Sequence, residues 1–473
     1  MRTAGMDAST PTTRQKALAL NLDARAYGTF AEIGGGQEVA RWFFSVGSAA
    51  GTVAKTISAY DMAISDGVYG AAERYVSRQR LEAMLEVEFA QLVEQLGGRR
   101  GESKCFFAFA NTVATRRFQT AQNGRGWLGI RFQAHPREQP SEVIIHAHLL
   151  DRTAEHEREA LGILGVNLIH AAFYEHAPPE HLIGSLMDDL SRERVEIDMI
   201  KLSGPVFAGV DNRLMSLALV ERGLTDAAMF TAAGEVVQPS EVLYKKPILI
   251  ERGSFRPATK LTLDLLQQAL RQFLQEPSTR GQTPVVLAEM TLRSLSQGPD
   301  AGREDFLARA DILGALGFDV LITRLALYYQ VAEYLTAYTD QLIGLAVGLP
   351  TVRQLLQERF YENLGGGLLE SAGRLFKRSV KVYVYPTRDP VSGQIETWDT
   401  VALPHPWQHL HRLLMELGHI VPIRSFEESY LSIRTPEVLA LIEKDDPSWE
   451  RLVPPTVAET IRSKRLFRPH ADA

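Results

Sequence analysis

The chain has 473 residues, of which 45% are hydrophobic and 23% are charged, and its formal net charge is −6. This length is enough for two or three domains of ordinary size. The composition excludes an intrinsically disordered chain, and the slightly acidic balance argues against a nucleic-acid-binding protein. A single cysteine, Cys105, excludes an intramolecular disulfide framework and favours a cytoplasmic location.

The N-terminal residues are polar and small and contain no apolar stretch of the kind found in a secretory signal. We therefore expect a flexible tail over residues 1–17. No run in the sequence reaches the ~18 apolar residues that a membrane helix needs, so we expect no membrane partner.

Residues 18–98 are rich in glycine and in helix-forming residues, and they predict a glycine-rich helical arm. An amphipathic pattern over residues 72–96 predicts a long helix that ends at Gly97 and Gly98. Gly34, Gly35 and Gly36 precede a helical stretch, where exposed backbone amides can bind an anion. We favour flexible packing or a subunit contact for this region, and hence a homo-oligomer formed through the arm.

The rest of the chain predicts an α/β fold with a mostly parallel sheet built from βαβ units, because short apolar runs alternate with helical windows. We expect a first α/β region over residues 99–239, a second over residues 240–388 and a helical C-terminal region over residues 389–473. Probable strands of the first region are residues 105–110, 127–132, 143–150 and 195–202. Those of the second region are residues 248–252, 285–290, 319–323, 342–347 and 380–385.

One strand of the second region is followed by a glycine and then by a helix. Ile248 to Arg252 form the apolar strand, Gly253-Ser254-Phe255 follows it, and a helix is expected from near Thr259, which is a good N-cap residue. A glycine at the carboxyl end of a strand lets backbone N–H groups approach a phosphate, and the next helix adds its positive dipole end. Any βα turn has the same appearance, so both interpretations stay open here.

The stretch G-S-F-R-P-A-T-K-L-T resembles the first signature of the nucleotidyltransferases that make NAD and related dinucleotides, G-[ST]-F-[DN]-P-x-[HT]-x-G-H. In that superfamily the segment follows the first strand and contacts the phosphates of ATP. The resemblance implies that ATP is a ligand and that three residues hold it: Gly253, Ser254 and Phe255. It also implies the catalytic positions Arg256, Thr259 and Thr262.

This sequence departs from the signature at the positions that carry catalysis. Arg256 stands at the Asp or Asn position, Leu261 at the glycine and Thr262 at the second histidine. A threonine hydroxyl cannot supply the positive charge that stabilises a developing phosphate charge. The nearest counterpart of the superfamily's second signature is residues 429–434, which a helix start explains more simply.

Two further stretches, A-E-I-G-G-G-Q-E-V-A-R-W-F-F and G-G-G-L-L-E-S-A-G-R-L-F, resemble a family of bacterial proteins of undefined function. Its members often carry the label nicotinate-nucleotide adenylyltransferase, and some carry the label TonB-dependent receptor. The second label conflicts with the absence of a signal-like N-terminus, and we reject it.

Carboxylates at the ends of predicted strands are candidates for acid–base or metal chemistry: Asp198, Asp211, Glu289 and Asp311. Glu289 emerges from an apolar strand, and its carboxylate suits a magnesium ion or a general base. We therefore take Glu289 as the candidate magnesium ligand.

His146 and His148 are two residues apart on a predicted strand, so both side chains point to the same face and can offer two metal ligands. A third ligand is not identified by the sequence, and His170, His176 and His181 are candidates only by proximity along the chain. Two structural histidines in a strand are the competing explanation.

These features support three functions. The first is an intracellular, cytoplasmic nucleotide-binding protein. With magnesium, this protein would also transfer an adenylyl group from ATP to a small molecule such as a pyridine mononucleotide. The second is a non-catalytic oligomeric or regulatory protein on an α/β scaffold, and the third is a metal-dependent hydrolase.

Overall fold

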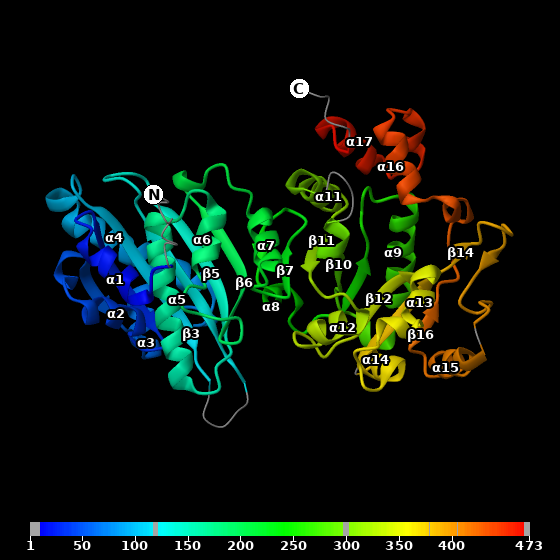
Figure 1. The fold of residues 1–473 in the computed structure, drawn as a ribbon, viewed down its shortest axis with the longest axis horizontal. Coiled ribbons are helices and arrows are strands. Elements are labelled where there is room, and N and C mark those ends of the chain that lie inside the picture. The colour runs from blue at the N-terminus through cyan, green and yellow to red at the C-terminus, as the bar shows by residue number, and fades with distance from the viewer. Residues whose placement is uncertain (1–9, 117–121, 297–301, 378, 404, 468–473) are drawn as a thin grey trace, which may run out of the picture. The chain divides into compact units, whose positions relative to one another are not determined.

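The computed structural model describes residues 10–116, 122–296, 302–377, 379–403 and 405–467, and the chain forms two compact units. The first unit ends at Thr225 and the second begins at Asp226. This division lies closest to the boundary expected near residue 239. The mixed α/β class expected from the sequence is confirmed in both units (Figure 1).

The first unit contains one six-stranded sheet with the order β2-β1-β3-β4-β5-β6. Strands β1, β2 and β3 run parallel, whereas β3 to β6 form an antiparallel meander. The strands are β1 (Ala26–Ile33), β2 (Val53–Ile57), β3 (Cys105–Ala114), β4 (Gly124–Phe132), β5 (Ser141–Leu149) and β6 (Val195–Ser203). The helices are α1 (Thr13–Leu22), α2 (Glu38–Val46), α3 (Met62–Tyr69), α4 (Arg78–Arg100), α5 (Ala154–Tyr174), α6 (Pro179–Ser185) and α7 (Asn212–Glu221).

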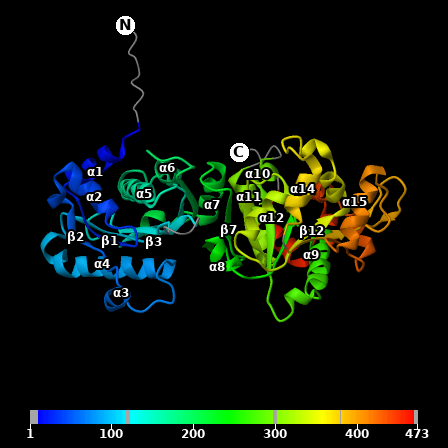
Figure 2. The same ribbon diagram turned by 90° about the horizontal axis from the view of Figure 1, so that it is seen from below.

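Helices cover both faces of this sheet. Figure 2 shows α1, α2 and α5 on one face and α4, with α3 beyond it, on the other. The core under α2 and α5 is rich in aromatic side chains, and the Phe30 ring lies 4.9 Å from the Phe43 ring and 5.6 Å from the Phe107 ring, measured between centroids. Burial of this apolar face is the main stabilising contribution to the unit.

Residues 18–98 do not form the helical arm that the sequence predicts. The segment supplies β1 and β2, and β1 is buried between β2 and β3 in the sheet of its own unit. Gly28 in β1 reflects close packing, because a Cβ there would lie 2.4 Å from the carbonyl oxygen of Phe107. Glycine in this segment therefore does not signal an extended arm, although the long helix expected over residues 72–96 is present as α4.

The flexible tail expected over residues 1–17 is only partly testable, because residues 1–9 lie outside the described residues. Helix α1 already begins at Thr13, and the Lys16 side chain is buried. Its ammonium group lies 2.6 Å from the Asp188 carboxylate and donates to the Asn167 side chain. This part of the segment is thus anchored in the first unit.

The second unit contains an eight-stranded sheet with the order β16-β13-β12-β9-β10-β11-β7-β8. The strands are β7 (Ala227–Phe230), β8 (Val236–Val237), β9 (Ile248–Arg252), β10 (Val285–Thr291), β11 (Asp319–Thr323), β12 (Ile343–Gly348), β13 (Val380–Tyr385) and β16 (Ile420–Pro422), with a small hairpin of β14 (Thr387–Arg388) and β15 (Ile395–Glu396) outside the sheet. The helices are α8 (Pro239–Leu243), α9 (Lys260–Phe273), α10 (Leu292–Leu295), α11 (Arg303–Ala315), α12 (Tyr328–Thr336), α13 (Leu349–Leu355), α14 (Gly367–Leu375), α15 (His405–Glu416), α16 (Thr435–Glu443) and α17 (Pro455–Lys464).

Six strands of this sheet are parallel: β9, β10, β11, β12, β13 and β16. The chain passes from β9 outward to β10 and β11, and then returns to β12 on the other side of β9 before it continues to β13 and β16. The strand order therefore reverses between β9 and β12. In doubly wound α/β proteins a crevice forms at this reversal, beyond the carboxyl ends of the strands.

Each core strand of this unit is buried on both faces, as its uninterrupted apolar sequence predicts. In β9, Ile248 and Ile250 belong to the core under α12 and α14, whereas Leu249 belongs to the core under α9. The five strands expected for this region are all present, and the described residues of the unit form five further short strands that were not expected: β7, β8, β14, β15 and β16.

The glycine turn before α2 does not present an open anion site, because a carboxyl group of the chain itself occupies it. The buried Glu32 carboxylate accepts hydrogen bonds from the N–H groups of Val39 (3.2 Å) and Ala40 (3.0 Å), at the N-terminus of α2. The Asn111 amide donates a third bond of 3.0 Å. Burial outweighs these bonds and raises the pKa of Glu32 to about 7.

We expect Glu32→Gln to remove a pH dependence of stability. The folded protein keeps the Glu32 proton up to about pH 7, whereas the unfolded chain loses it near the ordinary value of 4.5. The contribution of Glu32 to the free energy of unfolding is therefore at its full value below pH 4.5 and is lost as the pH rises through 7. Glutamine does not titrate, and its amide nitrogen cannot accept from an N–H donor as the carboxyl oxygen does, a cost that does not depend on pH. The free energy of unfolding of the variant relative to the wild type should therefore rise by about 3 kcal/mol between pH 4.5 and pH 8.

Urea unfolding at pH 4.5, 6 and 8 measures this difference, and Glu73→Gln, at an exposed position in the same unit, serves as the matched control. Equal pH slopes for Glu32→Gln and the wild type would contradict the assignment.

Candidate functional site

A cavity of about 640 Å³ lies in the second unit at the carboxyl ends of β9, β10 and β11, beside the helix that follows β12. Its walls come from residues 252–254, 291–294 and 324–328, from α13, and from residues 359–361. This is the place where the strand order reverses, and its volume is typical of sites for small molecules. The topology of the sheet thus creates the cavity.

The lining of the cavity is positively charged. It contains four arginines, Arg252, Arg293, Arg324 and Arg359, and the described residues that line it include no aspartate or glutamate. Arg293, Arg324 and Arg359 are exposed. Among the described residues, Arg324 lies 3.9 Å from the half-exposed Asp226 carboxylate, a distance at which an exposed pair contributes little. The cavity therefore favours an anionic ligand.

Arg252 is held by several partners among the described residues. Its guanidinium contacts both oxygens of the Glu289 carboxylate, at 3.0 and 2.7 Å, and donates to the carbonyl oxygens of Leu325 and Ala326. It also lies 4.6 Å from the centroid of the Tyr328 ring. Arg252 therefore holds the loop after β11 in place and forms one wall of the cavity.

Glu289, the expected magnesium ligand, is engaged by the protein itself. Its carboxylate is 1% exposed, and the Thr323 hydroxyl donates a further bond of 2.7 Å to Oε1. An Arg-paired carboxylate that is closed to solvent does not fit a magnesium ion, which needs open oxygen ligands and usually keeps several waters. A magnesium role for Glu289 would require Arg252 to leave.

The three residues expected to hold a nucleotide take different positions. Gly253 and Ser254 line the cavity, whereas Phe255 is buried and packs its ring against Gly253. A Cβ at residue 253 would lie 2.9 Å from that ring. The Gly253 N–H donates to the Glu289 carbonyl oxygen at 3.1 Å, so it is not available to a phosphate. Glycine at this position serves strand pairing and packing.

The N-terminus of α9 is closed by the protein's own groups. Thr259 and Thr262 form a reciprocal capping box, in which the Thr259 hydroxyl accepts from the Thr262 N–H at 3.3 Å. The Lys260 N–H donates to the carbonyl oxygen of Leu452 at 3.0 Å. The structure thus uses the two threonines for helix capping, a role that β-hydroxyl side chains commonly have.

Arg256, the third expected catalytic residue, belongs to a buried cluster of charges. Its Nε lies 2.6 Å from the Asp305 carboxylate, which also pairs with Arg309 one helical turn further along α11. Arg309 in turn donates to the Ser254 carbonyl oxygen at 3.2 Å. This cluster fixes the backbone of the turn after β9.

A second cavity, of about 490 Å³, lies near the expected second signature and includes Leu431, Ile433 and Arg434. Its arginines are engaged: Arg353 pairs with Glu396 at 2.8 Å and Arg388 with Glu428 at 2.6 Å. The Arg434 guanidinium donates to backbone carbonyl oxygens. We therefore take the larger, arginine-lined cavity as the candidate site.

The sequence analysis missed the residues that give this cavity its character: Arg293, Arg324, Arg359 and Phe360. Arg324 follows β11 directly and Arg293 lies two residues after the end of β10, so their position after apolar strands was a usable signal. Arg359 and Phe360 lie in a short 3-10 helix (Glu358–Phe360) after α13, and only tertiary packing brings them here.

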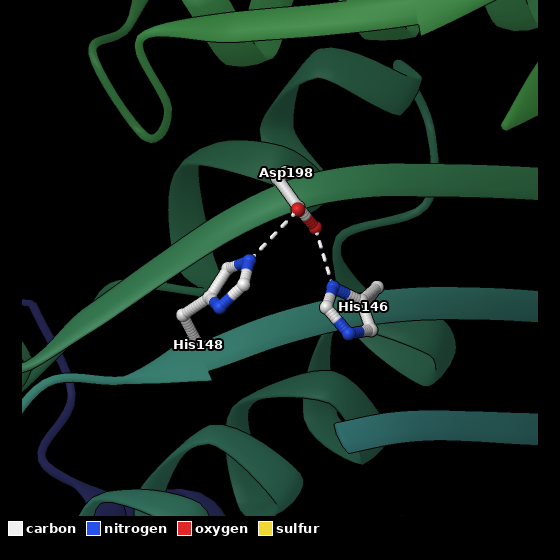
Figure 3. A group of neighbouring side chains, drawn as sticks. All are labelled: His146, His148 and Asp198. Atoms are coloured by element: carbon white, nitrogen blue, oxygen red, sulfur yellow. Dashed lines mark hydrogen bonds and ion pairs between the residues drawn. The ribbon is translucent and has the colours of Figure 1, made fainter. Parts of the chain in front are cut away.

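In the first unit, His146 and His148 come together with Asp198, one of the candidate strand-end carboxylates (Figure 3). The other proposed third ligands have other partners: His170 lies on α5 against Tyr174, and His176 bonds the Ala172 carbonyl group. Of the remaining strand-end carboxylates, Asp211 caps α7 and Asp311 pairs with Lys464. Within the described residues no helix is both long and apolar enough to cross a membrane.

No protein-family model matches the chain, and no curated protein matches its sequence. Among solved structures, a competence/damage-inducible protein of Agrobacterium tumefaciens matches with 16% identity and a TM-score of 0.25, over 34% of this chain and 94% of that protein. A competence-damaged protein (CinA) superfamily member of Enterobacter cloacae matches with 14% identity and a TM-score of 0.25, over 36% of this chain and 98% of its own.

The nicotinic acid mononucleotide adenylyltransferase of Plasmodium falciparum, complexed with APC, matches with 11% identity and a TM-score of 0.27, over 47% of this chain and 97% of that protein. These likenesses are too distant to bear on function.

Proposed function

We propose that the second unit binds a phosphorylated small molecule of the nucleotide class in the arginine-lined cavity. The observation that carries this proposal is the set of three exposed arginines, Arg293, Arg324 and Arg359, around a cavity with no carboxylate among its described lining residues. Guanidinium groups present forked donors that match phosphate oxygens. Ser254, Thr291 and Ser294 add hydroxyl groups to the same lining.

An aromatic side chain supports a nucleotide over a simple phosphate. Phe360 lines the cavity and is 37% exposed, and the Arg359 guanidinium lies 4.9 Å from its ring centroid. A base can stack on an exposed ring of this kind, and such stacking is worth about 1–3 kcal/mol. Charge for the phosphates and a ring for the base thus occur in one cavity.

We infer binding without adenylyl transfer. Arg256, Thr259 and Thr262 contact other groups of the protein, and the Gly253 N–H is used in the sheet. Among the described lining residues, the polar groups left for a ligand are arginines, hydroxyls and the Gln354 amide, which bind phosphates. A binding or regulatory role for the second unit follows from this set of groups.

Replacing Arg293 with glutamine should weaken the binding of ATP and the binding of inorganic pyrophosphate by about the same factor. Loss of one hydrogen-bonded guanidinium removes about 1.5–3 kcal/mol, or roughly a tenfold or larger rise in Kd. Isothermal titration calorimetry with each ligand measures the effect, and Arg271→Gln, at an exposed arginine on α9 outside the cavity lining, is the control. Equal affinities for Arg293→Gln and Arg271→Gln would place the ligand elsewhere.

Replacing Phe360 with alanine should distinguish the contribution of the base to binding from that of the phosphates. We expect weaker binding of ATP, by about tenfold from the lost stacking, and unchanged binding of inorganic pyrophosphate. Leu369→Ala removes a side chain that is more exposed and does not line the cavity, and it should change neither affinity. If pyrophosphate affinity falls as much as ATP affinity, Phe360 does not contact a base.

Incubation of the full chain with ATP, magnesium and nicotinate mononucleotide tests the absence of transfer. We expect a thermal shift with ATP but no release of pyrophosphate above the no-protein control. Sustained pyrophosphate release that Thr262→Val abolishes would restore the catalytic role of the signature residues.

A further inference from the structure

We propose that His146, His148 and Asp198 in the first unit bind one divalent transition-metal ion of the zinc class. His146 Nδ1 lies 2.6 Å from Asp198 Oδ1, and His148 Nε2 lies 3.0 Å from Asp198 Oδ2. Figure 3 shows the two imidazoles on β5 and the carboxylate on β6 pointing toward one another. The site shares no residue with the cavity of the second unit and does not depend on its ligand.

A β-bulge creates this arrangement. Along the β5–β6 ladder His146 lies opposite Met199 and Ala147 lies opposite Ile197, so the register shifts there and Asp198 is the extra residue of β6. A bulge re-aims a side chain, and bulges are frequent beside functional sites. The extra residue places the Asp198 carboxylate between the imidazoles of His146 and His148, which are two residues apart on β5 and therefore lie on the same face.

The chemistry of the donors favours a transition metal over magnesium or calcium. Two imidazole nitrogens and one carboxylate oxygen are common ligands of zinc and of other first-row metals, whereas magnesium and calcium take mainly oxygen. Three protein ligands leave at least one coordination position for water or a substrate. The ligand set is therefore of the kind found at catalytic centres and not at closed structural ones.

The spacing of the ligand atoms suits one ion after small movements. The three atoms lie within 4.8 Å of one another. Zinc bonds of about 2.0–2.2 Å place two ligands of one ion at most about 4.4 Å apart and, in a tetrahedral site, about 3.3–3.5 Å apart. For a tetrahedral site the close His146–Asp198 pair would open by up to about 1 Å, and a pair at the 4.8 Å limit would close by about 1.3–1.5 Å, movements that two side chains share. The metal would replace the hydrogens that now lie between the imidazoles and the carboxylate.

The surroundings hold the ligands in place. His146 and Asp198 are 4% and 2% exposed, while His148 is partly exposed and leaves a route to the site. The Trp127 ring on β4 lies 4.9 Å from the His146 ring, measured between centroids. Two of the three ligands are therefore preorganised by burial, and a fluorescent side chain lies beside them.

Metal content of the untagged full chain tests the proposal. The protein is stripped with chelator, reloaded with excess Zn²⁺, freed of unbound metal by gel filtration and assayed by mass spectrometry. We expect one zinc ion per chain for the wild type and for His156→Gln, a matched control at an exposed histidine of the same unit. Asp198→Asn and His148→Gln should lose stoichiometric zinc.

A spectroscopic readout covers the case in which a ligand variant fails to fold. Co²⁺ titrated into the wild type should quench Trp127 fluorescence to an endpoint of one equivalent. In Trp127→Phe the quenching should disappear while the zinc stoichiometry is unchanged. The proposal is overturned if the wild type retains no zinc, if Asp198→Asn binds as the wild type does, or if the quenching persists without Trp127. The three side chains would then form only a hydrogen-bonded network.

Discussion

The buried ion pair between Arg252 and Glu289 is the interaction on which the candidate site of the second unit depends. The two residues lie at the ends of β9 and β10, and Thr323 at the end of β11 donates to the same carboxylate. A buried carboxylate without a partner would be strongly destabilising, so the bidentate geometry and the threonine hydroxyl together make the arrangement tolerable. Three neighbouring strands are thereby joined at their carboxyl ends.

This pair also decides the charge of the cavity. It neutralises the Glu289 carboxylate, and its guanidinium fixes the carbonyl groups of Leu325 and Ala326 in the loop after β11. The exposed arginines then determine the local field, because no lining carboxylate among the described residues opposes them. The same contacts make Glu289 unsuitable for magnesium. One ion pair therefore joins the strands, leaves the cavity positively charged and removes the expected magnesium ligand.

In the first unit a comparable role belongs to an irregularity in the sheet. Without the bulge at Asp198, a regular antiparallel ladder would pair every residue of β6, and alternation would not place this carboxylate between His146 and His148. Although burial favours the neutral acid, the two imidazoles lower the pKa of the Asp198 carboxyl group. The cluster therefore holds a charged carboxylate inside the protein.

The sequence by itself determined the α/β class, the strands buried on both faces and the turn after β9, because hydrophobic runs and helix caps are local properties. It also singled out Gly253 and Ser254, which the structure places in the lining of the cavity, and the shared face of His146 and His148. Only the tertiary structure decided what these residues do. Thr259, Thr262, Arg256 and Glu289 have partners that are set by packing, and the cavity arginines and Asp198 reach their sites through strand order and a bulge, neither of which leaves a periodic signal in the sequence.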